Sequence, residues 1–335
     1  MFRSSFAAVL AAAALLCSAD ARAQNVVLYG LVDVSGSHSR ILGDADSHWR
    51  LDSGNMARSF IGFRGAEDLG GGLRAVFKLE SYVRVDTGHT GRFDTDSFWG
   101  RDANVGLSGA FGTTVLGRNV TPLYLTTINF NPFGESFGFS PSTRQYFAGA
   151  VLGDRSWNNS LSYTNNPKDA LRIHFAVNTP EDSGPSTGHN TGLSVSYITG
   201  PFAATLAAEK IKNSALPLPA GFERQTVIQA GATYDFKLVR LYGQVGRVKT
   251  EATIDSRTVL YQLGAAVPIE NSVILVAYGR SQTRTDSSRI TDQTFSLSYD
   301  YFLSKNTDVY VAALYEKSFN VTSGNSLAGG LRLRF

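Results

Sequence analysis

The strongest constraint on the fold is the alternation of apolar and polar side chains over residues 57–85. After a linker over 67–72, apolar and charged residues take opposite faces: Leu73, Ala75, Phe77, Leu79, Val83 and Val85 against Arg74, Lys78, Glu80 and Arg84. This period of two indicates a strand. At roughly 13 residues it exceeds the usual 5 or 6, whereas a tilted strand crossing a bilayer needs about 9 to 11 plus wet ends. With the glycine turn at 70–72, the stretch predicts two neighbouring strands of a membrane barrel.

The first 23 residues are predicted to form a secretory signal peptide. Arg3 precedes an apolar run over residues 6–16, and an Ala-Arg-Ala sequence ends at Ala23. The apolar run is too short for a transmembrane helix. We therefore expect cleavage after Ala23 and a mature chain of residues 24–335, exported through the periplasm.

The composition of the mature chain narrows its class. The single cysteine lies in the predicted leader, so no disulfide framework is expected. Without the leader's two arginines and one aspartate, 29 basic residues face 27 acidic ones, and this near balance gives no support to nucleic-acid binding. No other apolar run reaches 18 residues, which argues against a helical membrane protein. A membrane β-barrel remains compatible with this sequence, because the apolar and polar residues of its alternating strands average out in mean hydropathy.

The alternation recurs in sixteen segments, joined by short and longer connectors in turn. An even number of strands with short turns at one end is the plan of bacterial outer-membrane barrels. We expect one all-β domain, a 16-stranded antiparallel transmembrane β-barrel. The predicted strands are 25–36, 57–66, 73–85, 98–108, 113–120, 155–165, 170–178, 191–198, 202–211, 225–235, 238–250, 257–267, 272–283, 290–301, 307–318 and 325–335.

The last predicted strand indicates which face is wet. Leucines alternate there with Arg332 and Arg334. An arginine that faces lipid at mid-depth costs about 2–4 kcal/mol, so both arginines are expected to line the interior. Sixteen strands enclose more space than side chains fill, so this interior is predicted to hold water.

Residues 121–153 form the longest interval without alternation. They are rich in aromatic residues and carry only two charges, Glu135 and Arg144. Long irregular loops inside compact domains are usually functional. Because an exposed loop would be more polar, we expect this third long loop to fold into the barrel.

Several motifs, in their order along the chain, resemble those of the trimeric general porins of Gram-negative bacteria, especially the beta-proteobacterial branch. They are LYGLVD at 28–33, GFRGAEDLGGGL at 62–73, VGLSG at 105–109, LGR at 116–118, YDYFLSK at 299–305 and the terminal Phe335. The resemblance implies an outer-membrane homotrimer, among lipid and lipopolysaccharide, with an inward third loop as its constriction. It also implies that Phe335 belongs to the C-terminal signal read by the barrel-assembly machinery.

The family's pore places wall arginines opposite acids of the inward loop. Arg58, ahead of the run at 62–65, matches the first wall arginine, and Arg101 matches the second. Alternation alone would put Arg101 on the same face as Val105 and Leu107, so its lumenal role comes from the resemblance. Arg155 matches the third arginine. It lies one residue farther from the following Asn-Ser-Leu than the family spacing, so the sequence does not determine whether its side chain faces the lumen or the lipid.

The predicted constriction therefore has several guanidiniums and one carboxylate. Glu135 stands in a Pro-Phe-Gly-Glu order where the family has Pro-Glu-Phe-Gly, and Asn129 replaces a second acid. Arg118 and Arg144 are secondary pore-lining candidates, and Arg144 has loop anchoring as its alternative role. Screening acts over roughly 8 Å at physiological salt, so a passing ion is expected to sense the wall charge. We predict a general diffusion pore for ions and small hydrophilic solutes, with a modest preference for anions.

Two other classes of function fit the sequence less well. An outer-membrane enzyme needs a nucleophile and a positioned base, but the histidines lie singly, at His38, His48, His89, His174 and His189. Their spacing suits no metal site, and no glycine-rich phosphate loop is present. Catalysis, a cofactor and a metal are therefore not expected. A substrate-specific channel or a barrel adhesin is the alternative function, and the sequence names no preferred solute.

Overall fold

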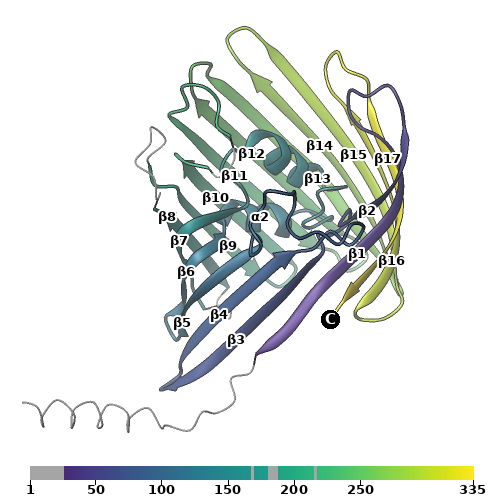
Figure 1. Cartoon of the computed structure of the whole chain (residues 1–335). Coiled ribbons are helices and arrows are strands. Elements are labelled where there is room, and N and C mark those ends of the chain that lie inside the picture. The colour runs from purple at the N-terminus through teal and green to yellow at the C-terminus, as the bar shows by residue number, and fades with distance from the viewer. Residues whose placement is uncertain (1–25, 167–169, 180–187, 215–216) are drawn as a thin grey trace, which may run out of the picture.

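The computed structural model describes residues 26–166, 170–179, 188–214 and 217–335. The predicted signal peptide, residues 1–23, lies outside the described residues. The described chain forms one antiparallel sheet that closes on itself as a barrel (Figure 1). Within these ranges, no helix is both long enough and apolar enough to span a bilayer.

The strands alternate between short turns at one end of the barrel and longer loops at the other. Their bounds are β1 Val27–Arg40, β2 His48–Ser53, β3 Phe60–Gly70, β4 Leu73–Tyr82, β5 Asp102–Gly109, β6 Gly112–Val120, β7 Ser156–Thr164, β8 Leu171–Asn178, β9 Thr191–Thr199, β10 Phe202–Ile211, β11 Arg224–Asp235, β12 Arg240–Glu251, β13 Ser256–Ile269, β14 Ser272–Arg284, β15 Arg289–Phe302, β16 Thr307–Lys317 and β17 Gly324–Arg334.

These seventeen strands occupy sixteen positions around the barrel. The first half of β1 pairs with β3, and its second half pairs with β2. β2 and β3 therefore lie in line, separated by a break over residues 54–59. β17 pairs with β1 along its other edge and closes the barrel. The predicted 16-stranded barrel is confirmed, although β2 falls between the predicted strands 25–36 and 57–66, where no strand is predicted.

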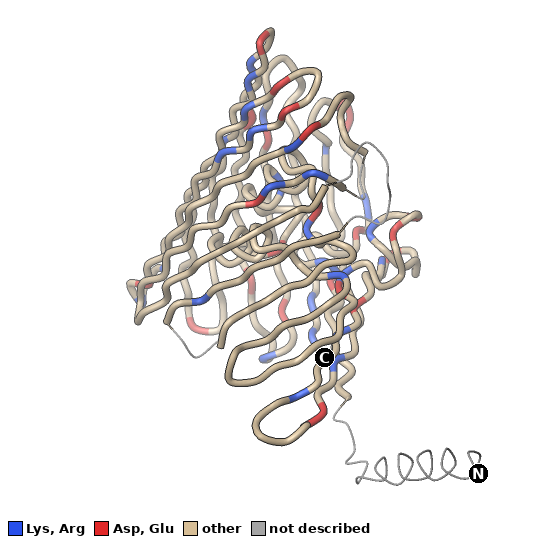
Figure 2. The backbone as a smooth tube through the Cα atoms, turned by 90° about the vertical axis from the view of Figure 1, so that its left-hand side faces the viewer, with Lys and Arg blue, Asp and Glu red and all other residues tan. Residues whose placement is uncertain are grey.

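The distribution of side chains is the reverse of that in a water-soluble protein. Outward positions carry exposed apolar residues, for example Leu263 at 68% and Leu327 at 57% exposure, while inward positions bury polar ones. Arg332 faces the interior as predicted, within 3.2 Å of Asp300 and 2.8 Å of Asp308. Along the slanting strands, charged residues gather toward the rims (Figure 2). This arrangement fits lipid outside and water inside.

The segment between β6 and β7 folds into the barrel, as predicted. It contains helix α2 (Pro122–Asn129), helix α3 (Pro141–Gln145) and a π-helical turn η1 (Tyr146–Ala150), and α2 lies inside the ring of strands (Figure 1). Each α-helix begins with proline in its first turn. The side chains of Thr121 and Ser140 cap them by accepting backbone N–H groups.

Amide and carboxyl side chains of the wall hold the inward loop in place. Glu209 accepts the Leu123 N–H at 2.8 Å, and Gln262 accepts the Ser142 N–H at 2.7 Å. Gln225 accepts from the Leu152 N–H and donates to the Ala150 carbonyl, at 2.9 Å in each case. Because buried backbone groups need partners, these wall side chains allow a loop without strand pairing to lie inside the barrel.

The wall also makes room for the loop at inward glycines on five strands. A Cβ atom at each would lie within 1.8–3.1 Å of a loop side chain. At Gly246 on β12, for example, it would lie 1.8 Å from the Tyr146 hydroxyl oxygen. The loop therefore packs directly against the strand backbone. These glycines are Gly192, Gly231, Gly246, Gly264 and Gly279.

We expect Gly246→Leu to displace Tyr146 and to destabilise the barrel by about 1–3 kcal/mol, the usual cost of overpacking. The control is Gly243→Leu on the outward face of the same strand, where the nearest atom to a Cβ lies 3.7 Å away. Denaturant titration in lipid vesicles measures both. Equal stabilities of the two variants would contradict the docking of the loop on Gly246.

Candidate functional site: the constriction

One open part of the lumen lies along the inner face of β4. A cavity of about 480 Å³ has Lys78 in its lining, and a second of about 340 Å³ has Tyr82. Between these two residues along the strand stands Glu80, which faces the same side. The side chains around Glu80 therefore separate the two cavities and form the candidate constriction.

Arg58 lies in the break between β2 and β3, and its side chain borders the smaller cavity. Its guanidinium lies 3.8 Å from the ring centre of Phe137 and 5.7 Å from that of Tyr82. Among the described residues no carboxylate lies within ion-pair distance of Arg58, so its charge stays available to a passing ion.

The break that carries Arg58 is held by Asp33 on β1. One oxygen of this fully buried carboxylate accepts the N–H groups of Met56 at 2.8 Å and Ala57 at 2.6 Å. The other accepts the Tyr310 hydroxyl at 2.8 Å. Asp33 therefore fixes the backbone immediately before Arg58.

Arg101 points into the lumen and joins the wall to the inward loop. Its Nε lies 2.8 Å from Glu80 Oε2, and its Nη1 donates to Glu135 Oε2 at 3.0 Å. β5 begins at Asp102, one residue later, so the alternation that would place Arg101 outward does not extend to it.

Arg155 lies behind this pair and is 2% exposed. It donates to the Tyr82 hydroxyl and, at 3.1 Å, to the Arg101 carbonyl, and it lies 4.9 Å from the ring centre of Tyr124. Its contacts are those of a residue that positions Tyr82 and Arg101, rather than of a group on the open surface of the pore.

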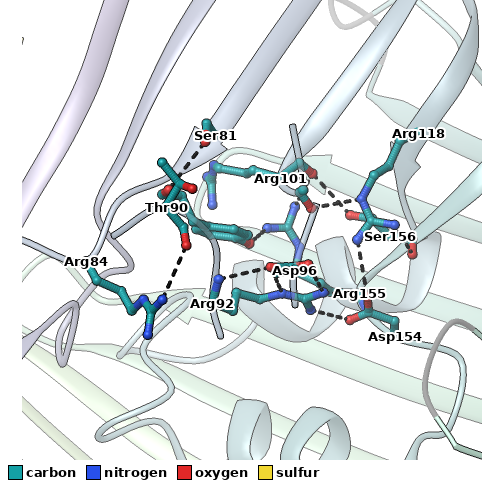
Figure 3. A network of polar contacts seen from close by, with 12 residues as sticks. Ser81, Arg84, Thr90, Arg92, Asp96, Arg101, Arg118, Asp154, Arg155 and Ser156 are labelled. Carbon is teal, nitrogen blue, oxygen red and sulfur yellow. Dashed lines mark hydrogen bonds and ion pairs between the residues drawn. The ribbon is translucent and has the colours of Figure 1, made fainter. Parts of the chain in front are cut away.

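Arg118 belongs to a second network that crosses three segments (Figure 3). Its Nη2 lies 3.2 Å from Asp154, and its Nε donates to the Gly100 carbonyl at 2.8 Å. Asp154 also binds Arg92 at 2.7 Å, and Arg92 in turn binds Asp96 at 2.8 Å.

Sequence reasoning missed four residues: Glu80 in the candidate constriction, and Arg92, Asp96 and Asp154 in the adjoining network. Glu80 could have been identified, because the alternation places it on the inward face of a predicted strand. The other three lie in loops, where alternation gives no direction. The spacing of four between Arg92 and Asp96 is too common to identify a pair.

Arg144 borders the smaller cavity and also anchors the inward loop. Its guanidinium makes two bonds to the Glu316 carboxylate, at 2.9 and 2.7 Å, and a third to the Phe137 carbonyl at 2.7 Å. Because Phe137 stacks on Arg58, this anchor also supports the constriction.

Phe335 lies at the seam of the barrel, far along the chain from its partner Gly30. The Phe335 N–H donates to the Gly30 carbonyl at 3.2 Å, and the Gly30 N–H donates to the Phe335 carbonyl at 3.0 Å. A Cβ at Gly30 would lie 2.6 Å from the Phe335 ring. The terminal aromatic residue therefore packs against the first strand and closes the sheet.

The charges of the candidate constriction and of the adjoining Arg118 network, taken together, nearly cancel. Five guanidiniums meet four carboxylates, which leaves one positive charge in excess. No group of three or more potential metal-ligating His, Cys, Asp or Glu side chains occurs in the described ranges. The cations are Arg58, Arg92, Arg101, Arg118 and Arg155, and the anions are Glu80, Asp96, Glu135 and Asp154.

Comparisons of the sequence and of the fold with known proteins all match porins. The chain is 30% identical over 317 residues to outer membrane porin protein 32 of Delftia acidovorans, covering 90% of this chain and 87% of that protein. Among solved structures, an anion-selective porin from Comamonas acidovorans matches with a TM-score of 0.80 at 24% identity, covering 93% of this chain and 100% of that one. The trimer form of OmpT from Vibrio cholerae matches with a TM-score of 0.71 at 13% identity, over 93% and 100% of the two chains. A family model described as Gram-negative porin matches residues 7–320. The chain therefore belongs to the Gram-negative porin family.

Proposed function

We propose that this outer-membrane porin is a general diffusion channel with a modest preference for anions. The observation that carries the proposal is Arg58, a cation at the narrow part of the lumen that no described carboxylate neutralises. Its stacking on Phe137 orients the guanidinium without cancelling its charge. The solved Comamonas protein of the same fold bears the description anion-selective, which agrees with this proposal.

Planar-bilayer recording of the purified protein tests the proposal. We expect ohmic conductance that does not saturate as salt rises, and a reversal potential in a KCl gradient with the sign of chloride preference. The preference should weaken at high salt, because screening shortens from roughly 10 Å at 0.1 M to 3 Å at 1 M. Saturation at low solute concentration would favour a substrate-specific channel instead, and clear potassium preference would contradict the anion proposal.

We also propose that the functional unit is a homotrimer. OmpT of Vibrio cholerae, which shares the barrel fold, has been solved in a trimer form. In this chain, the outward face around the barrel seam is apolar, with exposed Leu28, Val311 and Leu331 on β1, β16 and β17. This face suits a subunit contact. We further propose that Phe335 is read by the assembly machinery before it closes the seam.

Catalysis forms no part of this proposal. The described residues do bring one serine close to a histidine, since Ser162 Oγ lies 2.8 Å from His174 Nε2. The other ring nitrogen, Nδ1, has no hydrogen-bond partner there. A nucleophile needs a base that a third group orients, so this pair lacks what acyl transfer requires.

A further inference from the structure

The cavity of about 480 Å³ beside the constriction lies on the short-turn side of Glu80. Its lining includes Val76 and Lys78, which stand between Glu80 and the start of β4 at the turn. We call this space the inner cavity. In outer-membrane barrels the short turns are periplasmic, so a solute that enters from outside reaches the inner cavity directly after the constriction. Its volume falls within the range of ligand pockets, roughly 300–1,000 Å³, and is sufficient for a small organic molecule.

Two cations stand side by side in the wall of the inner cavity. Arg64 on β3 lies directly opposite Lys78 on β4, and like charges at such positions of a sheet repel one another. Lys78 is compensated by Asp102 at 2.8 Å. In the part of the chain that the structure describes, Arg64 forms no ion pair, and its guanidinium lies 4.8 Å from the ring centre of Tyr29. This basic row, Arg64 and Lys78, therefore keeps one positive charge that is available to a bound anion.

An apolar row lies next to the basic row, two residues closer to the short turns. Ala66 on β3 lies opposite Val76 on β4, and Gly106 on β5 stands between Val76 and Val115 on β6. Leu125 of helix α2 faces the same space. Residues two apart on a strand are separated by about 7 Å, which sets the distance between the two rows. The inner cavity thus has a cationic side and an oily side, although the interior of a porin barrel is polar as a rule.

Packing of the inward loop does not account for these apolar side chains. Val76, Val115 and Leu125 are each only half-buried, and the cavity lies between them. Leu123, two residues earlier in α2, is by contrast fully buried against the wall. The two valines and Leu125 therefore keep apolar surface toward the lumen, where its removal from water by a ligand is favourable.

We propose that the inner cavity binds small monocarboxylates that carry a hydrocarbon chain. The carboxylate contacts the basic row, and the chain lies along the apolar row. A guanidinium can hold a carboxylate by two parallel hydrogen bonds, and each methylene group removed from water strengthens binding. An inorganic anion such as phosphate is the competing occupant, and it fits less well because it gains nothing from the apolar row. The site rests on the proposed channel function, since a solute reaches the inner cavity through the lumen.

Block of the ion current by sodium hexanoate tests the proposal, in a planar phosphatidylcholine bilayer and dilute KCl. Acetate carries the same charge without the chain, and hexan-1-ol carries the same chain without the charge. For the wild type, we expect hexanoate to halve the current at a concentration about tenfold below that of acetate, because its chain is removed from water. Hexan-1-ol should leave the current unchanged.

Two variants separate the two sides of the site. Val76→Thr with Val115→Thr replaces apolar surface by hydroxyl groups at nearly constant volume, so hexanoate should block about fivefold less well while acetate is unaffected. Arg64→Gln removes the unpaired guanidinium, so both carboxylates should block about threefold less well. The matched control is Val273→Thr with Ala266→Ser, at inward positions of β14 and β13 outside the lining of the inner cavity. It should be blocked as the wild type is.

Equal block of the wild type by hexanoate and acetate would overturn the proposal, as would block by hexan-1-ol. The same follows if the control loses as much block as the valine variant, or if the valine and arginine variants both keep the block of the wild type. Ohmic current in KCl alone shows whether each variant folds. A normal wild-type current that hexanoate does not reduce would refute the site and leave the proposed channel function in place, whereas absence of any current would refute both.

Discussion

Arg58→Glu is expected to reverse the selectivity of the channel from anions to cations. The constriction carries one excess positive charge, and the substitution changes its total by two units. Two unit charges about 4 Å apart in water interact by about 1 kcal/mol. A two-unit change therefore acts on a passing ion by about 1–2 kcal/mol, with opposite signs for chloride and potassium, so the chloride-to-potassium permeability ratio should fall by at least about tenfold. The reversal potential in a tenfold KCl gradient measures it.

The control for this prediction is Arg240→Glu, which makes the same charge change at an exposed site. The Arg240 side chain is 51% exposed and pairs with Asp235 near a tight turn. Water and salt screen a charge there, so its effect on the reversal potential should be small. If Arg58→Glu kept the preference of the wild type, Arg58 would not control selectivity. If both variants shifted equally, selectivity would depend on the overall charge and not on the constriction.

Arg101 and Arg155 show how far alternation can assign a side chain. The period of two predicted the barrel because lipid and water impose opposite polarity on successive residues of every strand. Arg101 and Arg155 each precede a strand by one residue, so the pleat does not set their direction. Their orientation depends on Tyr82 and Glu80, which come from another strand. The resemblance to porins placed Arg101 in the lumen, where the structure has it.

The segments around Asp33 and Asp154 could not be predicted for a different reason. β2 continues the line of β3 past a break, and the break forms because the Asp33 side chain replaces the partners that a strand would supply. Asp154 joins two arginines from separate loops. Both arrangements depend on contacts between residues far apart in the sequence, and a local pattern carries no record of such contacts.

Asp33→Ala is expected to weaken both the fold and the anion preference. The substitution leaves the Met56 and Ala57 N–H groups and the Tyr310 hydroxyl without their buried acceptor. An unsatisfied buried group costs about 1–3 kcal/mol, so, allowing for relaxation, we expect a loss of about 3 kcal/mol in the free energy of unfolding. The backbone before Arg58 loses its fixed position, so the chloride preference should also decline. Denaturant titration in lipid vesicles and the reversal potential measure the two effects.

Tyr310→Phe separates the two effects, because it removes one bond of the same carboxylate and leaves the two backbone amides bound. We expect it to cost about 1 kcal/mol and to leave selectivity unchanged, since the Met56 and Ala57 N–H groups still hold the break. A fall in chloride preference equal to that of Asp33→Ala would mean that stability alone governs the constriction. Unchanged selectivity in Asp33→Ala would show that Phe137 positions Arg58 without help from the backbone.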